Sequence, residues 1–196
     1  MKQTIIPILD AGHGKDTSGK RSPIWKDGQQ LLEYEFNRNI VDRIAEILRN
    51  EGIKYHILVP EIIDISLAER CRRANRLHRQ YSKQTFLVSV HGNAGGGTGW
   101  EVWTSVGQTK ADALATIFYE EVKREFEEKR MRTDFYDGDP DKESKFYILK
   151  HTEAPALLTE NFFMDTEKDC RLMMSEEGRQ RIAKAHAEAI KRIVMA

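Results

Sequence analysis

Two histidines and a glutamate have the residue types and surroundings of a metal-dependent hydrolase. His13 and His91 each precede a glycine shortly after an apolar run, and Glu160 lies between the apolar segments 156–158 and 162–164. Glycine lets the backbone approach a bound group closely, and a carboxylate in an apolar segment is costly unless it is paired or bound to a cation. Two imidazoles and one carboxylate suit a catalytic zinc ion, which keeps one position open for a water that ionises near neutral pH.

With His13 and His91 as two of the ligands, the sequence offers two acids as the third. Glu33 and Glu35 both stand at the start of a predicted helix, where the helix dipole favours a carboxylate. Residues two apart on a helix point in different directions, so only one of them could reach the metal. Taken alone, each candidate also has a structural explanation, as a turn histidine or as an acid in the first turn of a helix.

The elements that must position these residues follow from the periodicity of apolar residues. Helices are predicted over 31–50, 66–79, 110–128 and 175–194, with Ser66 as a cap, and strands over 4–9, 55–59, 86–90, 100–104, 146–149 and 156–159. Segment 130–144 is predicted to be a loop. The alternation predicts an α/β fold, a single domain over residues 1–196 with a mixed, mostly parallel sheet of about six strands and helices on both faces. His13, His91 and Glu160 then stand at or just past strand ends, where α/β sheets bind ligands.

Composition excludes several other classes of protein. The 196 residues carry 31 Lys+Arg and 31 Asp+Glu, so the net charge of +0 gives no support for nucleic-acid binding. No apolar run approaches the roughly 18 residues of a membrane span, and the apolar stretch near the N-terminus is too short for a signal peptide. Cys71 and Cys170 lack metal or disulfide spacing and are predicted to be reduced thiols. His78 and His186 lie in charged segments and are predicted on solvated helix faces.

Several segments together resemble one family of enzymes. They are ILDAGHGKDTSG, LLEYEFNRNIVDRIAEILRNEGI, SLAERCRRANRL, FLVSVHGNA, TGWEVW and YILKHTEAPALLTENFFMDTEKDCRLM. Their order and approximate spacing, from about residue 4 to residue 190, are similar to the zinc-dependent N-acetylmuramoyl-L-alanine amidases often called amidase 3. Each motif alone is weak, but the ordered set is specific.

The resemblance implies roles for particular residues. It implies that Zn²⁺ is held by His13, Glu33 and His91, so it selects Glu33 over Glu35, and that Glu160 is the catalytic glutamate. It implies that Asp10 and Asn93 lie in a second shell or in the cleft, where ligand histidines usually find partners. Two departures stand out. Lys15 replaces a second glycine after the DAGHG motif, and Glu160-Asn161-Phe162-Phe163 stands where the family often has Glu-x-Gly-Phe.

The resemblance also implies an activity and a biological setting. The expected reaction is hydrolysis of the amide between N-acetylmuramic acid and L-alanine in peptidoglycan, without nucleic acid, membrane or obligate protein partner. The alternatives are a zinc hydrolase cutting within the stem peptide and a non-catalytic wall-binding module. The expected protein is made in the cytoplasm and acts on the cell wall, as a phage lysin released by a holin or as an exported enzyme lacking its leader.

Overall fold

The computed structural model describes residues 5–196, and in this range six strands form one sheet of order β2-β1-β3-β6-β4-β5. The strands are β1 (Ile6–Ala11), β2 (His56–Ile57), β3 (Thr85–Asn93), β4 (Trp100–Ser105), β5 (Lys142–Ser144) and β6 (Ala156–Phe163). Strand β4 is antiparallel to β6, and the other neighbours are parallel. The predicted mixed, mostly parallel sheet is therefore confirmed. Thr4, predicted to open the first strand, lies outside the described residues.

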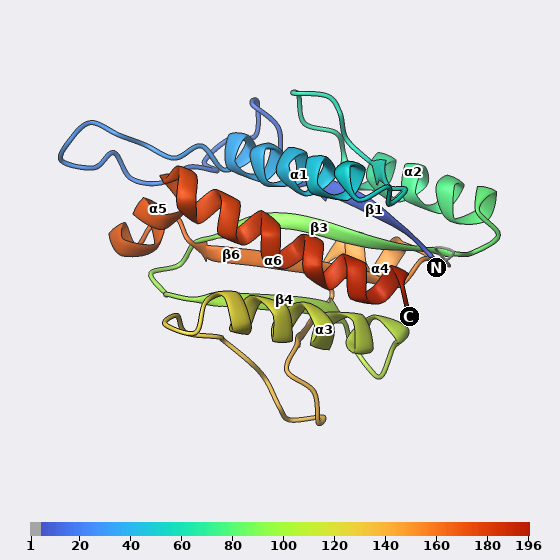
Figure 1. Ribbon diagram of the computed structural model, residues 1–196. Coiled ribbons are helices and arrows are strands. Elements are labelled where there is room, and N and C mark those ends of the chain that lie inside the picture. Colours follow the sequence, from blue (N-terminus) through green and yellow to red (C-terminus); the bar gives the residue numbers. More distant parts are fainter. Residues whose placement is uncertain (1–4) are drawn as a thin grey trace.

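Helices cover both faces of the sheet, as predicted (Figure 1). Helices α1 (Glu33–Asn50), α6 (Glu176–Val194) and α3 (Lys110–Glu125) lie side by side on one face, and α2 (Leu67–Gln80) and α4 (Tyr147–His151) pack on the other. Each face of the sheet thus has its own hydrophobic core. Phe36, Ile40 and Ile44 of α1 point into the core on the first face, because apolar residues four apart share a helix face. The second core joins α2 and α4 to β1, β3 and β6.

Capping side chains fix the starts of three helices. The side chain of Ser66 accepts a hydrogen bond from the amide of Glu69 at α2, as its position predicted. Thr109 and Asp112 form a reciprocal capping box at α3, and Ser175 accepts from the amide of Gly178 at α6. These bonds satisfy amides that have no partner within the helix.

Four elements differ from the prediction. Segment 146–149, predicted as a strand, belongs mostly to α4, where Ile148 and Leu149 are buried in the core shared with α2. The sixth strand is instead β5, in a segment predicted to be a loop. Helix α5 (Glu167–Met174) was not predicted, and β6 continues past residue 159 to Phe163.

The predictions for two histidines were wrong. His78 and His186 are both buried, and each has polar partners inside the fold. His78 Nδ1 lies 2.8 Å from the hydroxyl of Thr85, and His186 bridges the carbonyl oxygen of Ile182 and the hydroxyl of Thr159 at 2.8 and 3.0 Å. A buried imidazole is tolerated when its ring nitrogens find polar partners in this way.

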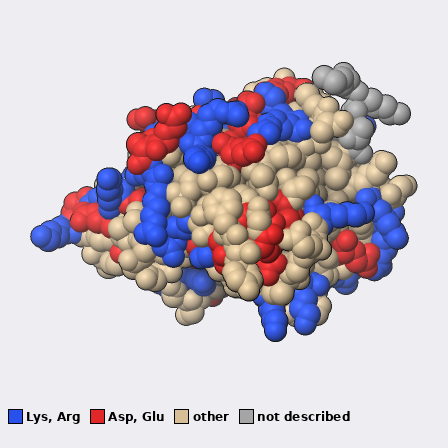
Figure 2. All heavy atoms as spheres, turned by 90° about the horizontal axis from the view of Figure 1, so that it is seen from below, with Lys and Arg blue, Asp and Glu red and all other residues tan. Residues whose placement is uncertain are grey.

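The surface and the thiols agree with the composition. On the face seen in Figure 2, acidic and basic side chains are interspersed. Cys71 and Cys170 are free and buried. Among the described residues, none of the helices combines the length and the apolar character needed to cross a bilayer.

Candidate functional site

Three predicted metal ligands meet at one end of the sheet. His13 lies in the loop after β1, Glu33 is the first residue of α1, and His91 lies near the end of β3. Glu33 Oε1 is 3.3 Å from His13 Nε2 and 3.2 Å from His91 Nδ1. One potential ligand atom from each side chain lies within 4.8 Å of the others, which makes the group a possible metal site.

The donor set fits a zinc ion. Glu33 is buried, and its Oε2 has no hydrogen-bond partner among the described residues. Burial would raise the pKa of this carboxyl, but the hydrogen bonds from His13 and His91 outweigh burial and hold the pKa well below its usual range. The site thus offers a carboxylate with a spare oxygen beside two imidazoles, a set that catalytic zinc sites use. Glu35 is exposed and accepts a hydrogen bond from the hydroxyl of Tyr34, away from this group.

The two glycines around His13 are required by close packing. A Cβ on Gly12 would stand 2.1 Å from the ring of His91, and a Cβ on Gly14 would stand 2.0 Å from the backbone of Asp64. Neither distance is sterically possible without moving the neighbour. The glycine pattern in the sequence therefore reflects the room that the His91 ring and the segment at Asp64 occupy.

Glu160 lies beside the histidine cluster on the neighbouring strand. Glu160 of β6 is the direct register partner of His91 of β3, so the two side chains share a face of the sheet. Its Oε2 is buried with no hydrogen-bond partner among the described residues. Burial raises the pKa of this carboxyl to about 7, although His91 counteracts part of the effect. The group is therefore able to take up and release a proton near neutral pH.

A second buried glutamate, which the sequence did not single out, stands next to Glu160. Glu101 of β4 is the register partner of Glu160 on its other side. It accepts hydrogen bonds from Arg132 at 2.9 Å, Lys142 at 3.0 Å and Asn93 at 2.6 Å. These partners keep the pKa of Glu101 low despite its burial. The signal in the sequence was an acid between apolar residues of a strand, the same signal that marked Glu160.

The two predicted cleft residues have different surroundings. Asn93 donates its hydrogen bond to Glu101 rather than to a histidine ring. Asp10 is buried in β1, where it accepts from Arg70 and from the hydroxyl of Ser89, both at 2.6 Å. Both residues thus lie close to the cluster in the fold, and their roles stay predictions.

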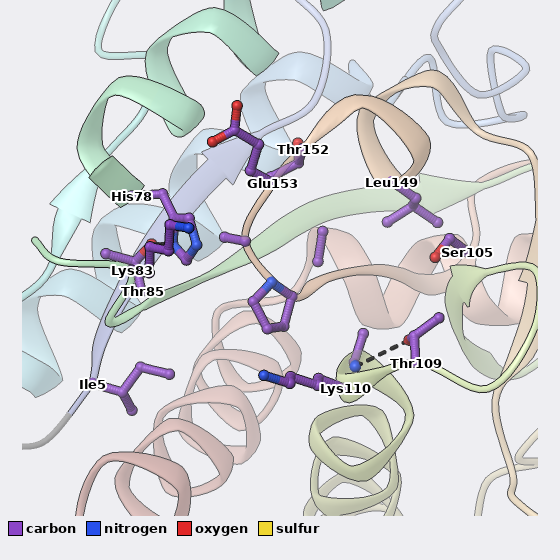
Figure 3. Close-up of a pocket in the computed structure, with 14 residues that line it drawn as sticks. Ile5, His78, Lys83, Thr85, Ser105, Thr109, Lys110, Leu149, Thr152 and Glu153 are labelled. Atoms are coloured by element: carbon purple, nitrogen blue, oxygen red, sulfur yellow. Dashed lines mark hydrogen bonds between the residues drawn. The ribbon is translucent and has the colours of Figure 1, made fainter. Parts of the chain in front are cut away.

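A cavity of about 240 Å³ opens beside the cluster. His13, His91, Asp10, Arg70 and Leu67 are among its lining residues. A larger cavity, of about 550 Å³, lies at the opposite end of the sheet, where His78, Thr85 and Lys110 are among the residues that surround it (Figure 3). The larger cavity contains none of the predicted site residues, whereas His13, His91 and Asp10 line the smaller one.

Comparison with known proteins finds relatives that match most of this chain. The N-acetylmuramoyl-L-alanine amidase CwlM of Bacillus licheniformis is 30% identical over 191 residues, which cover 94% of this chain and 67% of that protein. The endolysin of Bacillus phage SPP1 is 30% identical over 191 residues, covering 95% of this chain and 65% of the relative. The chain thus spans about two thirds of the length of these relatives.

The fold and the family agree with these relatives. The crystal structure of an N-acetylmuramoyl-L-alanine amidase from Clostridium difficile 630 has the same fold, with a TM-score of 0.83, 23% identity, and coverage of 100% of this chain and 99% of that one. Residues 8–192 match the sequence profile of the family described as N-acetylmuramoyl-L-alanine amidase. The chain therefore belongs to the N-acetylmuramoyl-L-alanine amidase family of enzymes, as its ordered motifs predicted.

Proposed function

We propose that this chain hydrolyses the amide bond between N-acetylmuramic acid and L-alanine in peptidoglycan, and that the reaction depends on zinc. One observation carries the proposal. In a member of this family, two histidines and a buried glutamate meet at the end of the sheet, and the adjacent strand carries Glu160, whose Oε2 has no hydrogen-bond partner among the described residues. The whole described unit then acts as a single catalytic domain.

His13, Glu33 and His91 would hold the metal. A zinc ion bound there supplies Lewis-acid chemistry, because it lowers the pKa of water and polarises a carbonyl group. The protein contributes the anionic Glu33 carboxylate, which lies between both rings and balances part of the metal charge.

Glu160 acts as the general base and then as the general acid. Its unpaired Oε2 takes the proton of the attacking water and delivers it to the departing amine of L-alanine. The negative charge of Glu101 beside it is balanced by ion pairs with Arg132 and Lys142. Glu160 is therefore the carboxyl left free to exchange protons. Asp10 joins β1 to α2 through Arg70 and to β3 through Ser89, and Asn93 joins β3 to β4 through Glu101.

The test is digestion of purified peptidoglycan by the protein alone, with and without a chelator, followed by mass spectrometry of the products. Stem peptides with a free L-alanine amine are expected, and chelation should abolish their release. Glu160→Gln should lower the rate on the order of 100-fold or more, because the proton transfer is lost. Glu35→Gln is the matched control, since Glu35 is exposed and should leave the rate unchanged.

Each other product pattern identifies a different function. Cleavage between amino acids of the stem peptide would replace the proposed bond and keep the site chemistry. Wall binding without any release by the zinc-loaded protein would favour a binding module. Activity only after addition of another protein would contradict the expectation that no obligate partner is needed.

We also propose that the enzyme acts at the cell wall, as an endolysin or as a bacterial wall hydrolase. The similarity to the phage endolysin and to the Bacillus amidase supports both settings.

A further inference from the structure

The backbone at His13 has a conformation that residues other than glycine rarely adopt. Its φ of 61° lies in the left-handed region, where a Cβ meets the backbone unfavourably. In this conformation His13 Nε2 lies 3.3 Å from Glu33 Oε1. The orientation of this predicted ligand therefore depends on contacts that hold a disfavoured backbone.

Two arginines converge on the carbonyl oxygen of His13. Arg38 Nη1 of α1 donates to it at 2.9 Å, and Arg70 Nη2 of α2 donates at 3.3 Å. Arg70 Nη1 also donates to the carbonyl oxygen of Ala11 at 2.7 Å. A carbonyl oxygen has two lone pairs, and this one accepts a hydrogen bond from each of two guanidinium groups, which come from different helices.

Arg70 is itself held by a full set of contacts. It is buried, and its remaining donors bind Asp10 at 2.6 Å, Asp64 at 3.1 Å and the carbonyl oxygen of Ile65 at 2.7 Å. Together with the bonds to the loop, these contacts account for all five N–H groups of a guanidinium. The planar group thus fixes the loop relative to β1 and to the start of α2.

Arg38 connects the loop to the helix that carries Glu33. Its Nε and Nη2 donate to the carbonyl oxygen of Glu61 at 3.1 and 2.7 Å, and its Nη1 also donates to that of Tyr34 at 3.2 Å. Arg38 lies five residues after Glu33 on α1. A single side chain therefore links the peptide of one predicted ligand to the helix of another.

We propose that Arg38 and Arg70 are positioning residues for the metal centre: by sharing the carbonyl oxygen of His13, they hold its left-handed backbone and direct its imidazole at the metal before the metal binds. This role rests on the proposed zinc-dependent function. Preorganisation of this kind raises metal affinity, because the protein does not have to order the loop when the ion binds.

The test is Arg38→Met, which keeps most of the side-chain length and removes every donor. Zinc dissociation constants are measured by competition with a chromophoric chelator, beside the melting temperature of each metal-free protein. The matched control is Arg43→Met on the same helix, because Arg43 binds Glu176 of α6 and does not reach the loop. Arg38→Met should weaken zinc binding about 10- to 100-fold, whereas Arg43→Met should not. Arg38→Lys should recover part of the affinity through its one ammonium group.

A readout without metal separates positioning from stability. The amide of Gly14, which donates to the hydroxyl of Thr17 at 3.0 Å, should exchange its hydrogen faster in metal-free Arg38→Met than in Arg43→Met. Arg70→Lys is the second variant and should weaken zinc binding in the same direction while keeping a charge beside Asp10. A tight wild-type site that Arg38→Met leaves unchanged would overturn the role of Arg38 alone. A wild-type protein without zinc affinity would overturn the proposed function as well.

Discussion

At the scale of single residues, Phe162 shows how burial outweighs backbone strain next to the site. Its φ is 66°, at the position where the family motif often has glycine. The left-handed conformation costs a residue with a Cβ about 1–2 kcal/mol. However, the ring is fully buried and packs against Phe126 with ring centroids 5.1 Å apart, and loss of a buried phenylalanine costs about 3–5 kcal/mol.

Replacement of this phenylalanine by glycine should therefore destabilise the protein. Phe162→Gly should lose roughly 2 kcal/mol of unfolding free energy, because the strain it relieves is smaller than the burial it removes. Urea unfolding at neutral pH measures the difference. A variant as stable as the wild type would mean that the strained backbone cancels the whole contribution of the ring.

At the scale of elements, a buried hydrogen-bond network joins α6 to the strands of the site. His186 of α6 contacts the hydroxyl of Thr159, which also accepts from Asn161 Nδ2 at 3.1 Å. Asn161 donates to the carbonyl oxygen of His91 at 3.0 Å and accepts from Trp100 Nε1 at 2.9 Å. Asn161, at the variable position of the family motif, thus connects β6 to the strands on both of its sides.

Because His186 is buried, the protein should lose stability in acid. Burial lowers the pKa of His186 from its ordinary value of 6.5 to about 4. As the pH falls below 6.5, the unfolded chain therefore takes up a proton before the folded protein does, and the stabilisation present above pH 6.5 is lost progressively toward pH 4. At about 1.4 kcal/mol for each pH unit, this loss approaches roughly 3 kcal/mol.

The measurement compares urea unfolding of the wild type and His186→Gln between neutral pH and pH 4.5. Gln cannot gain the proton, so the stability advantage of the wild type should shrink as the pH falls. His151→Gln is the control, because His151 is exposed. A gap that stays constant with pH would show that His186 does not titrate differently in the folded and unfolded states.

The elements that the sequence predicted well are those with a long apolar repeat. Phe36, Ile40 and Ile44 recur every four residues, and this pattern identifies α1 without ambiguity. Segment 146–149 offered only a short apolar run, which is compatible with either a helix or a strand. His186 was misplaced because its segment carries charged residues, Lys184 and Glu188 among them, whereas its partner Thr159 lies on a strand 27 positions away.

The candidate site was predictable only where local sequence patterns mark its residues. Glycines beside His13 and His91, and apolar residues around Glu160, are local signals that the sequence displays directly. The pairing of Glu160 with both His91 and Glu101 depends on the order β3-β6-β4, in which sequential strands are not neighbours. Strand order depends on how the helices pack on both faces, so local patterns could mark Glu101 as an acid within a strand but could not place it beside Glu160.

At the scale of the whole molecule, the site joins parts of the chain that are distant in sequence. The loop after β1, the start of α1 and the end of β3 each contribute one predicted ligand, and the packing of α1 on the sheet brings them together. Because Glu33 Oε1 lies against both histidines, a metal ion bound there would tie these three elements to one another. Metal binding should therefore be linked to the stability of the complete fold.

Zinc should accordingly raise the melting temperature of the protein, and a chelator should reverse the change. A ligand that binds only the folded state stabilises it by about 4 kcal/mol when its free concentration is 1,000 times the dissociation constant. For a chain of this size, that energy corresponds to a rise of roughly 10 °C. Thermal unfolding of the metal-free protein, with and without added zinc, measures the shift.

Glu33→Gln should abolish this rise in melting temperature. Glu35→Gln, two residues away on the exposed side of the same helix, should retain it in full. If Glu33→Gln kept the wild-type shift, zinc would be stabilising the fold from another position, and the three-residue cluster would lose its role as the metal centre.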